Sequence, residues 1–286
     1  MSLRQLPIVD ITAFDALRDL DTGLEPDALA RWNVAARALE TGADNVISIY
    51  DRIGEDFEGR GVTDKLVAAL LRRIGARDVV VNINSPGGIF YQGLAIYNLL
   101  RAHPHKVHVN IIGAAASAAS FIAMAGDQIE IARASFMMIH NAQGIAIGNR
   151  HDLAEAIDML AGFDKIMADI YASRTGIPAA EIAAMLDKET YFDGEQAVAS
   201  KFADALLPAD RVAEDAEASA SAAPVLAVRR IDAALARQGM SKGQRRELIK
   251  EFRSGKSGAA APSAMHDAGD IALAAEMRRA ISTFSM

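Results

Sequence analysis

The chain has 286 residues, of which 51% are hydrophobic and 23% are charged, and it contains no cysteine. This length suits one large domain or two modest ones, and the hydrophobic content excludes disorder over the whole chain. The lack of cysteine excludes disulfide scaffolds, thiolate nucleophiles and cysteine-based zinc sites. The formal net charge is −7, yet residues 229–256 hold nine Lys and Arg against three Asp and Glu. The acidic remainder disfavours nucleic-acid binding, whereas the basic stretch suits an acidic partner.

No apolar run reaches the roughly 18–20 residues that a membrane-spanning helix needs. The first 15 residues show no basic region followed by an apolar core. We therefore expect neither a secretory signal nor a membrane partner.

The first half of the chain alternates between strand and helix patterns. Residues 1–44 form a mixed N-terminal segment, helical at best over residues 25–41. Strands are then predicted at residues 45–50, 78–84 and 106–112, and helices at residues 63–73, 89–101 and 118–125. This β-α-β-α-β-α order predicts an α/β fold with a parallel sheet and right-handed crossovers.

The second half continues this domain and then changes in composition. Strands are predicted at residues 128–132 and 136–140, and helices at residues 152–174, 179–186 and 195–201. The Ala-, Ser-, Asp- and Glu-rich residues 208–227 include two prolines and predict a linker. Residues 228–286 predict a basic, partly helical tail, with helical segments at 228–253 and 270–284 around a second linker at 254–265. The main domain is therefore expected over residues 45–207.

The run Asn84-Ser-Pro-Gly-Gly88 follows a predicted buried strand and precedes a helix. Two glycines allow backbone angles that other residues avoid, and they leave amide groups unshielded. At the carboxyl edge of a parallel sheet, such amides are placed to bind an anion or a carbonyl oxygen. An ordinary strand-to-helix turn is the alternative.

Ser117 lies among small residues, in Gly113-Ala-Ala-Ala-Ser117, directly after the third strand. A serine at a strand-to-helix junction lies near the positive end of the helix dipole, as in a nucleophile elbow. The alternative is that Ser117 only caps the helix. Ser120, one turn further on, is the weaker candidate nucleophile.

His140 ends the apolar strand Met137-Met-Ile-His140, where a histidine is costly to bury without a partner. Histidine is also the side chain best suited to proton transfer near neutral pH, although a paired core histidine is the alternative. Further on, Asp187 and Glu189 lie between two short helices and offer an acid to orient such an imidazole. The histidines His103, His105 and His108 form a possible metal site, for which solvated loop residues are the simpler interpretation.

Four of these segments, in order and spacing, resemble the proteolytic subunit of the Clp protease over about residues 45–207. They are Asn84-Ser-Pro-Gly-Gly88, Gly113-x-Ala-Ala-Ser117, Met138-Ile-His140 and Glu189 followed by Glu195-x-Ala-Val198. The segments Glu189-Thr-Tyr-Phe192, Ala95-Ile-Tyr-Asn98 and Ala123-Met-Ala-Gly-Asp127 resemble the phage and prophage branch of this family that is linked to head maturation. The resemblance implies a fold similar to that of crotonases, with the long helix near residues 152–174 as a protruding handle that joins rings of subunits.

The resemblance also implies a role for each matched residue. Ser117 becomes the nucleophile, His140 the general base, and Gly88 and Ala118 the donors of the oxyanion hole. The third member becomes Glu189, where the housekeeping family has aspartate, and Asp187 is the alternative acid.

This reading predicts a serine endopeptidase that works through an acyl-enzyme, without a metal or a nucleotide cofactor of its own. Its expected substrate is a phage capsid or scaffold protein, its expected form a homo-oligomeric ring, and its expected location the bacterial host cytoplasm. Whether an unfoldase docks is left open. The alternatives are a catalytically silent capsid assembly or scaffold protein on the same fold, a crotonase-type acyl-CoA enzyme, and a Ser–Lys peptidase.

Overall fold

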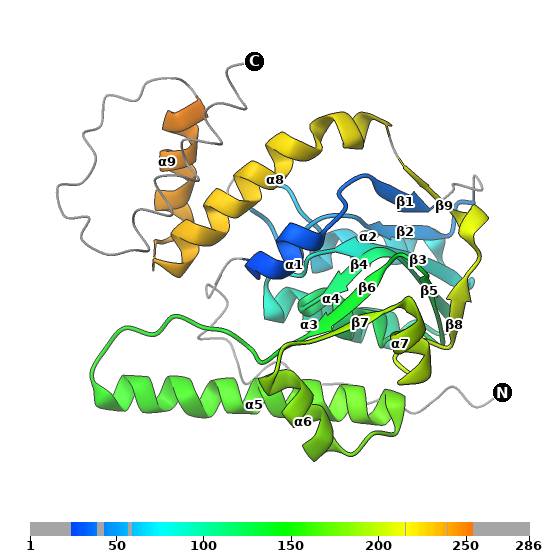
Figure 1. Cartoon of the computed structure of the whole chain (residues 1–286), viewed down its shortest axis with the longest axis horizontal. Coiled ribbons are helices and arrows are strands. Elements are labelled where there is room, and N and C mark those ends of the chain that lie inside the picture. The colour runs from blue at the N-terminus through cyan, green and yellow to red at the C-terminus, as the bar shows by residue number, and fades with distance from the viewer. Residues whose placement is uncertain (1–23, 39–42, 57–58, 215, 239, 254–286) are drawn as a thin grey trace.

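A largely parallel sheet forms the centre of this computed structural model, which describes residues 24–38, 43–56, 59–214, 216–238 and 240–253 (Figure 1). The strand order is β2-β3-β4-β5-β8, with β6 beside β4 and β7 beside β6. The strands are β2 (Val46–Ile49), β3 (Val79–Ser85), β4 (Val107–Ala116), β5 (Gln128–Ala132), β6 (Phe136–Ile139), β7 (Thr190–Asp193) and β8 (Ala205–Leu207). The β6–β7 pair is antiparallel and the other pairs of this sheet are parallel. The predicted α/β class with a parallel core is confirmed.

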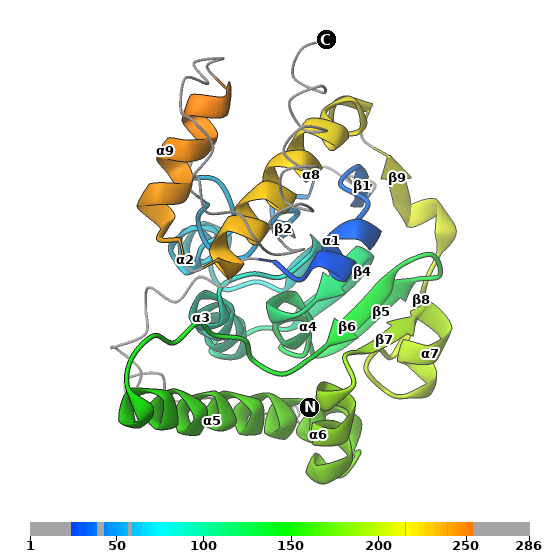
Figure 2. The same ribbon diagram turned by 60° about the vertical axis from the view of Figure 1, so that its left-hand side comes forward.

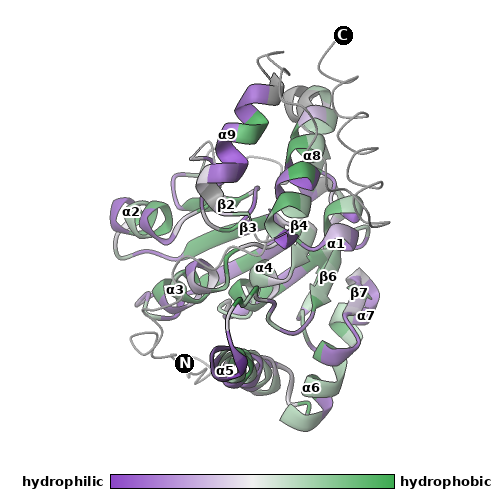
Figure 3. Cartoon of the chain, turned by 90° about the vertical axis from the view of Figure 1, so that its left-hand side faces the viewer, coloured by the Kyte–Doolittle hydropathy of each residue, from purple (hydrophilic) through white to green (hydrophobic). Residues whose placement is uncertain are grey.

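Helices α2 (Asp64–Ile74), α3 (Phe90–Arg101) and α4 (Ala118–Ala123) follow β2, β3 and β4 in turn. The Thr63 side chain caps the start of α2 by accepting a hydrogen bond from the Leu66 amide, and Gly75 ends the helix with a positive φ. Most residues of β3 and β4 are buried, and aliphatic residues predominate in both strands, as expected for a sheet covered on both faces (Figure 3).

The long helix α5 (Arg150–Thr175) extends along one side of the molecule (Figures 1 and 2). It begins with a capping box between Asn149 and Asp152. Large apolar side chains are exposed near its start, with Ile147 at 87% and Ile157 at 66%. Helices α6 (Ala179–Asp187) and α7 (Gly194–Ala199) follow it. No helix in the described ranges is both long and apolar enough to span a membrane.

The N-terminal segment differs from the expected helix over residues 25–41. It forms a short helix, α1 (Pro26–Arg31), and a strand, β1 (Ala36–Ala38). Burial decides this outcome, because Ala28 of α1 packs on Ala116 and Met138 at the carboxyl ends of β4 and β6. Long-range contacts of this kind override local helix propensity.

The prediction of a linker at residues 208–227 is wrong, because most of this segment forms regular secondary structure. It contains a 3-10 turn (Ala209–Arg211), the strand β9 (Val212–Glu214), which pairs with β1, and the first half of helix α8 (Ala216–Arg237). Alanine favours helix strongly, and Val225 and Leu226 pack against the cluster that holds Trp32. The expected tail helix near residues 228–253 corresponds to the end of α8 and to α9 (Lys242–Arg253). The second linker at 254–265 and the helix at 270–284 lie outside the described residues.

Buried ion pairs connect α8 and α9 to the loop after β2. Arg229 pairs with Asp56 at 2.5 Å and with Asp51 at 2.7 Å. Asp232 lies between Arg52 at 3.0 Å and Arg245 at 2.8 Å. These contacts attach the C-terminal helices to the body that carries the sheet.

Candidate active site

Ser117 occupies the sharp turn between β4 and α4. Its backbone has φ 51° and ψ −123°, a strained conformation for a residue with a side chain. Its amide donates a hydrogen bond to the Met138 carbonyl at 2.9 Å, which ties the turn to β6. The Ser117 side chain makes no capping hydrogen bond to α4. The turn therefore presents the hydroxyl to the carboxyl edge of the sheet, as a nucleophile elbow does.

His140 directly follows β6, which lies parallel to β4 with Met138 opposite Ala116. This register places the His140 Nε2 atom 2.7 Å from the Ser117 Oγ atom. The histidine is 8% exposed, and burial lowers its pKa from the ordinary value, while the charge of Glu25 opposes that shift. A mostly neutral imidazole in hydrogen-bond contact with a hydroxyl is able to accept its proton.

The diglycine turn after β3 lies directly against Ser117. A Cβ atom on Gly87 would lie 2.6 Å from the Ser117 Cβ atom, so only glycine fits there. Gly88 has φ 149°, and a Cβ atom there would lie 2.2 Å from the Ile53 carbonyl oxygen. The amides of Gly88 and Ala118 have no acceptor within the described part of the chain. Two free N–H groups thus lie beside the hydroxyl, which is what an oxyanion hole requires.

Two acids lie near His140, and the sequence predicted only one of them, Glu189. Glu189 is brought close, with its carboxylate and the His140 ring within 4.8 Å of one another. Asp187 accepts a hydrogen bond from the Asn141 side chain at 2.8 Å and does not belong to this cluster. Glu25 from the N-terminal segment is its third member. The sequence carries no local signal for Glu25, because 115 residues separate it from His140.

Both expected oxyanion donors open onto the same small cavity as Ser117 and His140, with a volume of about 40 Å³. The lining residues are Leu24, Glu25, Gly88, Ile89, Phe90, Ser117, Ala118, Phe121, His140, Asn141, Ala142, Gln143 and Met167. Ser117 is partly exposed, and its hydroxyl is reached from this cavity.

With this geometry established, the sequence model of the Clp protease family matches residues 35–209. The chain belongs to the Clp protease family. Three relatives carry names of ATP-dependent Clp protease proteolytic subunits. That of Pleurastrum terricola is 32% identical over 45% of this chain and 66% of its own length. Subunit 3 of Rhodococcus jostii is 33% identical over 42% and 61%, and subunit 1 of Prochlorococcus marinus is 29% identical over 58% and 91%.

The matches to the first two relatives cover less than two thirds of those proteins' own length. Membership of the Clp protease family supports a peptidase. The family match starts at residue 35 and ends at residue 209, so it includes neither Glu25 nor helices α8 and α9.

The remaining candidates in this Clp family chain do not form a second site. Ser120 bonds to the Tyr171 hydroxyl at 2.7 Å and is fully buried. Of the other histidines, His103 bonds to the Arg77 carbonyl at 2.7 Å, and no three-ligand cluster forms around it among the described residues.

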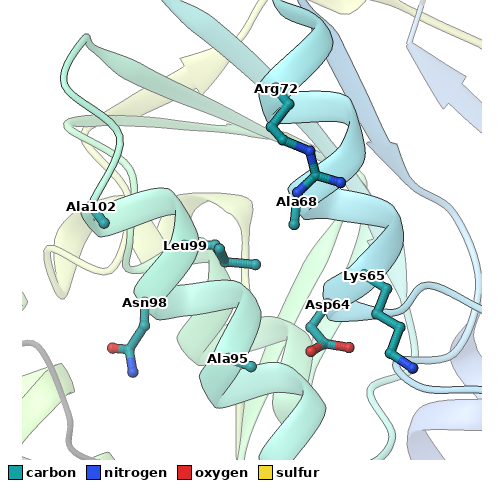
Figure 4. A pocket seen from close by; sticks show the side chains of 8 residues that line it. All are labelled: Asp64, Lys65, Ala68, Arg72, Ala95, Asn98, Leu99 and Ala102. Atoms are coloured by element: carbon teal, nitrogen blue, oxygen red, sulfur yellow. The ribbon is translucent and has the colours of Figure 1, made fainter. Parts of the chain in front are cut away.

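A separate cavity of about 720 Å³ lies between α2 and α3 (Figure 4). Its lining residues are Asp64, Lys65, Ala68, Arg72, Ala95, Asn98, Leu99 and Ala102. No serine or histidine lines it, so it offers no pair for covalent acyl transfer.

Proposed function

We propose that this chain is a serine endopeptidase that cleaves peptide bonds through an acyl-enzyme. The observation that carries the proposal is the 2.7 Å contact between Ser117 Oγ and His140 Nε2, made at a strained turn beside two free amides. Covalent acyl transfer requires a nucleophile, a general base and donors for the oxyanion, and this site brings all three together.

In the proposed reaction, His140 Nε2 accepts the proton of the Ser117 hydroxyl as its oxygen attacks the scissile carbonyl. The amides of Gly88 and Ala118 bind the oxyanion that forms, and loss of one such donor typically costs about 10²- to 10³-fold in rate. The imidazolium then protonates the leaving amine, and water repeats the sequence to release the acyl group. The chemistry requires neither a metal nor a nucleotide, and Glu189 is the proposed acid beside the imidazole.

We further propose a substrate and an assembly. The segments Glu189-Thr-Tyr-Phe192 and Ala123-Met-Ala-Gly-Asp127 favour the head-maturation branch of the family, and hence a phage capsid or scaffold protein as substrate in the host cytoplasm. The exposed Ile147 and Ile157 near the start of α5 favour contact with a second copy, in line with a ring-shaped homo-oligomer.

The proposal is tested with a fluorophosphonate probe, which reacts with activated serines. We expect labelling of the wild-type chain at Ser117, found by peptide mapping, and no labelling of Ser117→Ala. Ser120→Ala is the matched control, and EDTA is expected to leave labelling unchanged.

An unlabelled but folded wild type would refute the hydrolase and favour the silent scaffold or the acyl-CoA enzyme. The substrate is tested separately, by co-expression with the capsid protein encoded nearest to this gene. Equal processing by wild type and Ser117→Ala would refute that part of the proposal.

A further inference from the structure

An acid from outside the region of family similarity lies at the proposed catalytic base. The carboxylate of Glu25, a ring nitrogen of His140 and the carboxylate of Glu189 all lie within 4.8 Å of one another. His140 Nε2 contacts Ser117, and the charge of Glu25 at this distance acts on the same imidazole. The family match starts ten residues after Glu25.

Glu25 is held in place by two side chains from different parts of the chain. Arg237 near the end of α8 pairs with the Glu25 Oε2 atom at 3.3 Å and also donates to the Leu24 carbonyl at 3.5 Å. Gln143, from the loop after His140, donates to the same carboxylate oxygen at 3.2 Å. The Glu25 side chain is only 11% exposed. These contacts restrict the carboxylate to the neighbourhood of the imidazole.

The backbone around Glu25 is anchored as well. The Trp32 indole donates to the Asn84 carbonyl at 3.2 Å, and the Asn84 side chain donates to the carbonyls of Asn33 and Ala36. The N-terminal segment is thus fastened to the end of β3, just before the diglycine turn. Helix α8, which carries Arg237, lies beside α1 in both views and is fastened by its own buried ion pairs (Figures 1 and 2).

Glu189 by itself is a less suitable partner for a charged imidazole. It is exposed and has φ 49°, in the left-handed region that a side chain disfavours. Partial desolvation of the carboxylate and the charges of Glu25 and Asp27 raise the pKa of Glu189, while the charge of Arg237 opposes this shift. Glu25, in contrast, is largely buried and has a direct ion pair, with Arg237 at 3.3 Å.

We propose that Glu25 is a positioning residue, which orients the His140 ring toward Ser117 and stabilises its protonated form, with Arg237 holding the Glu25 carboxylate in place. The proposal rests on the proposed function and extends it, because the N-terminal segment and α8 then complete the catalytic site. When His140 accepts the proton of Ser117, the new positive charge faces Glu25 and Glu189, and Arg237 limits the excess negative charge around the ring.

The test compares Glu25→Gln with Glu189→Gln and with Glu181→Gln, a control at an exposed position of α6. Each full-length variant is assayed for fluorophosphonate labelling rate, for kcat and KM on a peptide ester, and for thermal unfolding. Loss of the only acid of a triad lowers kcat by roughly 10⁴-fold. Because Glu189 remains in Glu25→Gln, we expect this variant to lower kcat by only about 10- to 100-fold, with little change in KM. Glu25→Asp is expected to recover part of this loss, and Glu181→Gln to match the wild type.

The pH profile separates positioning from a structural role. Removing the negative charge of Glu25 lowers the pKa of His140 further, so the acid limb of the kcat/KM profile is expected to move to lower pH. A loss of folded protein lowers the amplitude without moving this limb. A rate and an acid limb equal to those of the wild type would overturn the proposal. A faster Glu25→Gln would also overturn it, since Glu25 would then oppose the reaction.

The outcomes are distinguishable from failure of the proposed function. If the wild type is not labelled at Ser117, the hydrolase itself fails and this inference with it. If the wild type is labelled and only Glu189→Gln is impaired, the hydrolase stands and Glu25 has no positioning role.

Discussion

A buried arginine on α8 offers the sharpest test of how the C-terminal helices are attached. Arg229 is 2% exposed and pairs at 2.5 Å with Asp56, whose side chain is fully buried. The charges of Asp51 and Asp56 raise the pKa of Arg229 against the opposing effect of burial. We predict that Arg229→Met lowers the free energy of unfolding by about 3 kcal/mol, because it removes the nearest cation from the buried Asp56 carboxylate and leaves the longer contact with Arg60, at 3.5 Å.

The measurement is urea unfolding followed by the fluorescence of the single tryptophan, Trp32, which is 2% exposed in the N-terminal segment. The matched control is Arg230→Met, at an exposed position next to Arg229 that loses the same charge. We expect the control to stay within about 0.5 kcal/mol of the wild type. Equal unfolding midpoints and equal m-values for the two variants would refute the reasoning, since the ion pair would then contribute nothing. A lower m-value for Arg229→Met alone would indicate that α8 and α9 detach before the body unfolds.

Three further predictions concern the site and the assembly. Gly88→Ala places a Cβ atom 2.2 Å from the Ile53 carbonyl oxygen, so we expect the rate of probe labelling to fall by about 10²-fold or more in a folded chain. The control Gly162→Ala, whose Cβ atom has nothing within 4 Å, is expected to label at the wild-type rate. Equal labelling of the two variants would contradict the assignment of Gly88 to the oxyanion hole. Because burial lowers the pKa of His140, labelling should be constant above neutral pH and decline with a midpoint below 6.5; a midpoint above 6.5 would contradict a buried neutral base. Ile157 is 66% exposed, so Ile157→Asp should change the free energy of unfolding by no more than about 0.5 kcal/mol relative to the wild type, while the mass of the assembly found by analytical ultracentrifugation should fall. An unchanged mass would exclude this part of α5 from the interface between subunits.

Local patterns in the sequence were sufficient for the core of the fold. The predicted helix at residues 63–73 is α2, with its cap at Thr63 and its end at Gly75, because capping and amphipathic spacing act within a few residues. The predicted strand at residues 78–84 is β3, and its β-branched residues Val79, Val81 and Ile83 are fully buried. The predicted long helix at residues 152–174 is α5.

The same local logic failed at both ends of the chain. Residues 208–227 resemble a linker in composition, yet α8 covers their second half because Val225 and Leu226 find an apolar partner surface at the N-terminal segment. The helix expected over residues 25–41 shortens to α1 for the matching reason, since β1 pairs with β9. Each of the two segments is structured by its contacts with the other, so the local sequence of one segment is not sufficient to predict its structure.

By itself, the sequence determined the order of the strands and helices from β2 to α6. It also determined the residue types at the ends of these strands, including a serine, a histidine and two glycines. Only the tertiary structure decided that Ser117 and His140 are in hydrogen-bond contact, because the parallel register of β4 and β6 brings the two strand ends together. It also decided that Glu25 and Arg237 meet beside the imidazole, although 212 residues separate them. Periodicity and capping are short-range properties, whereas these contacts depend on chain closure around a shared core, which no local pattern encodes.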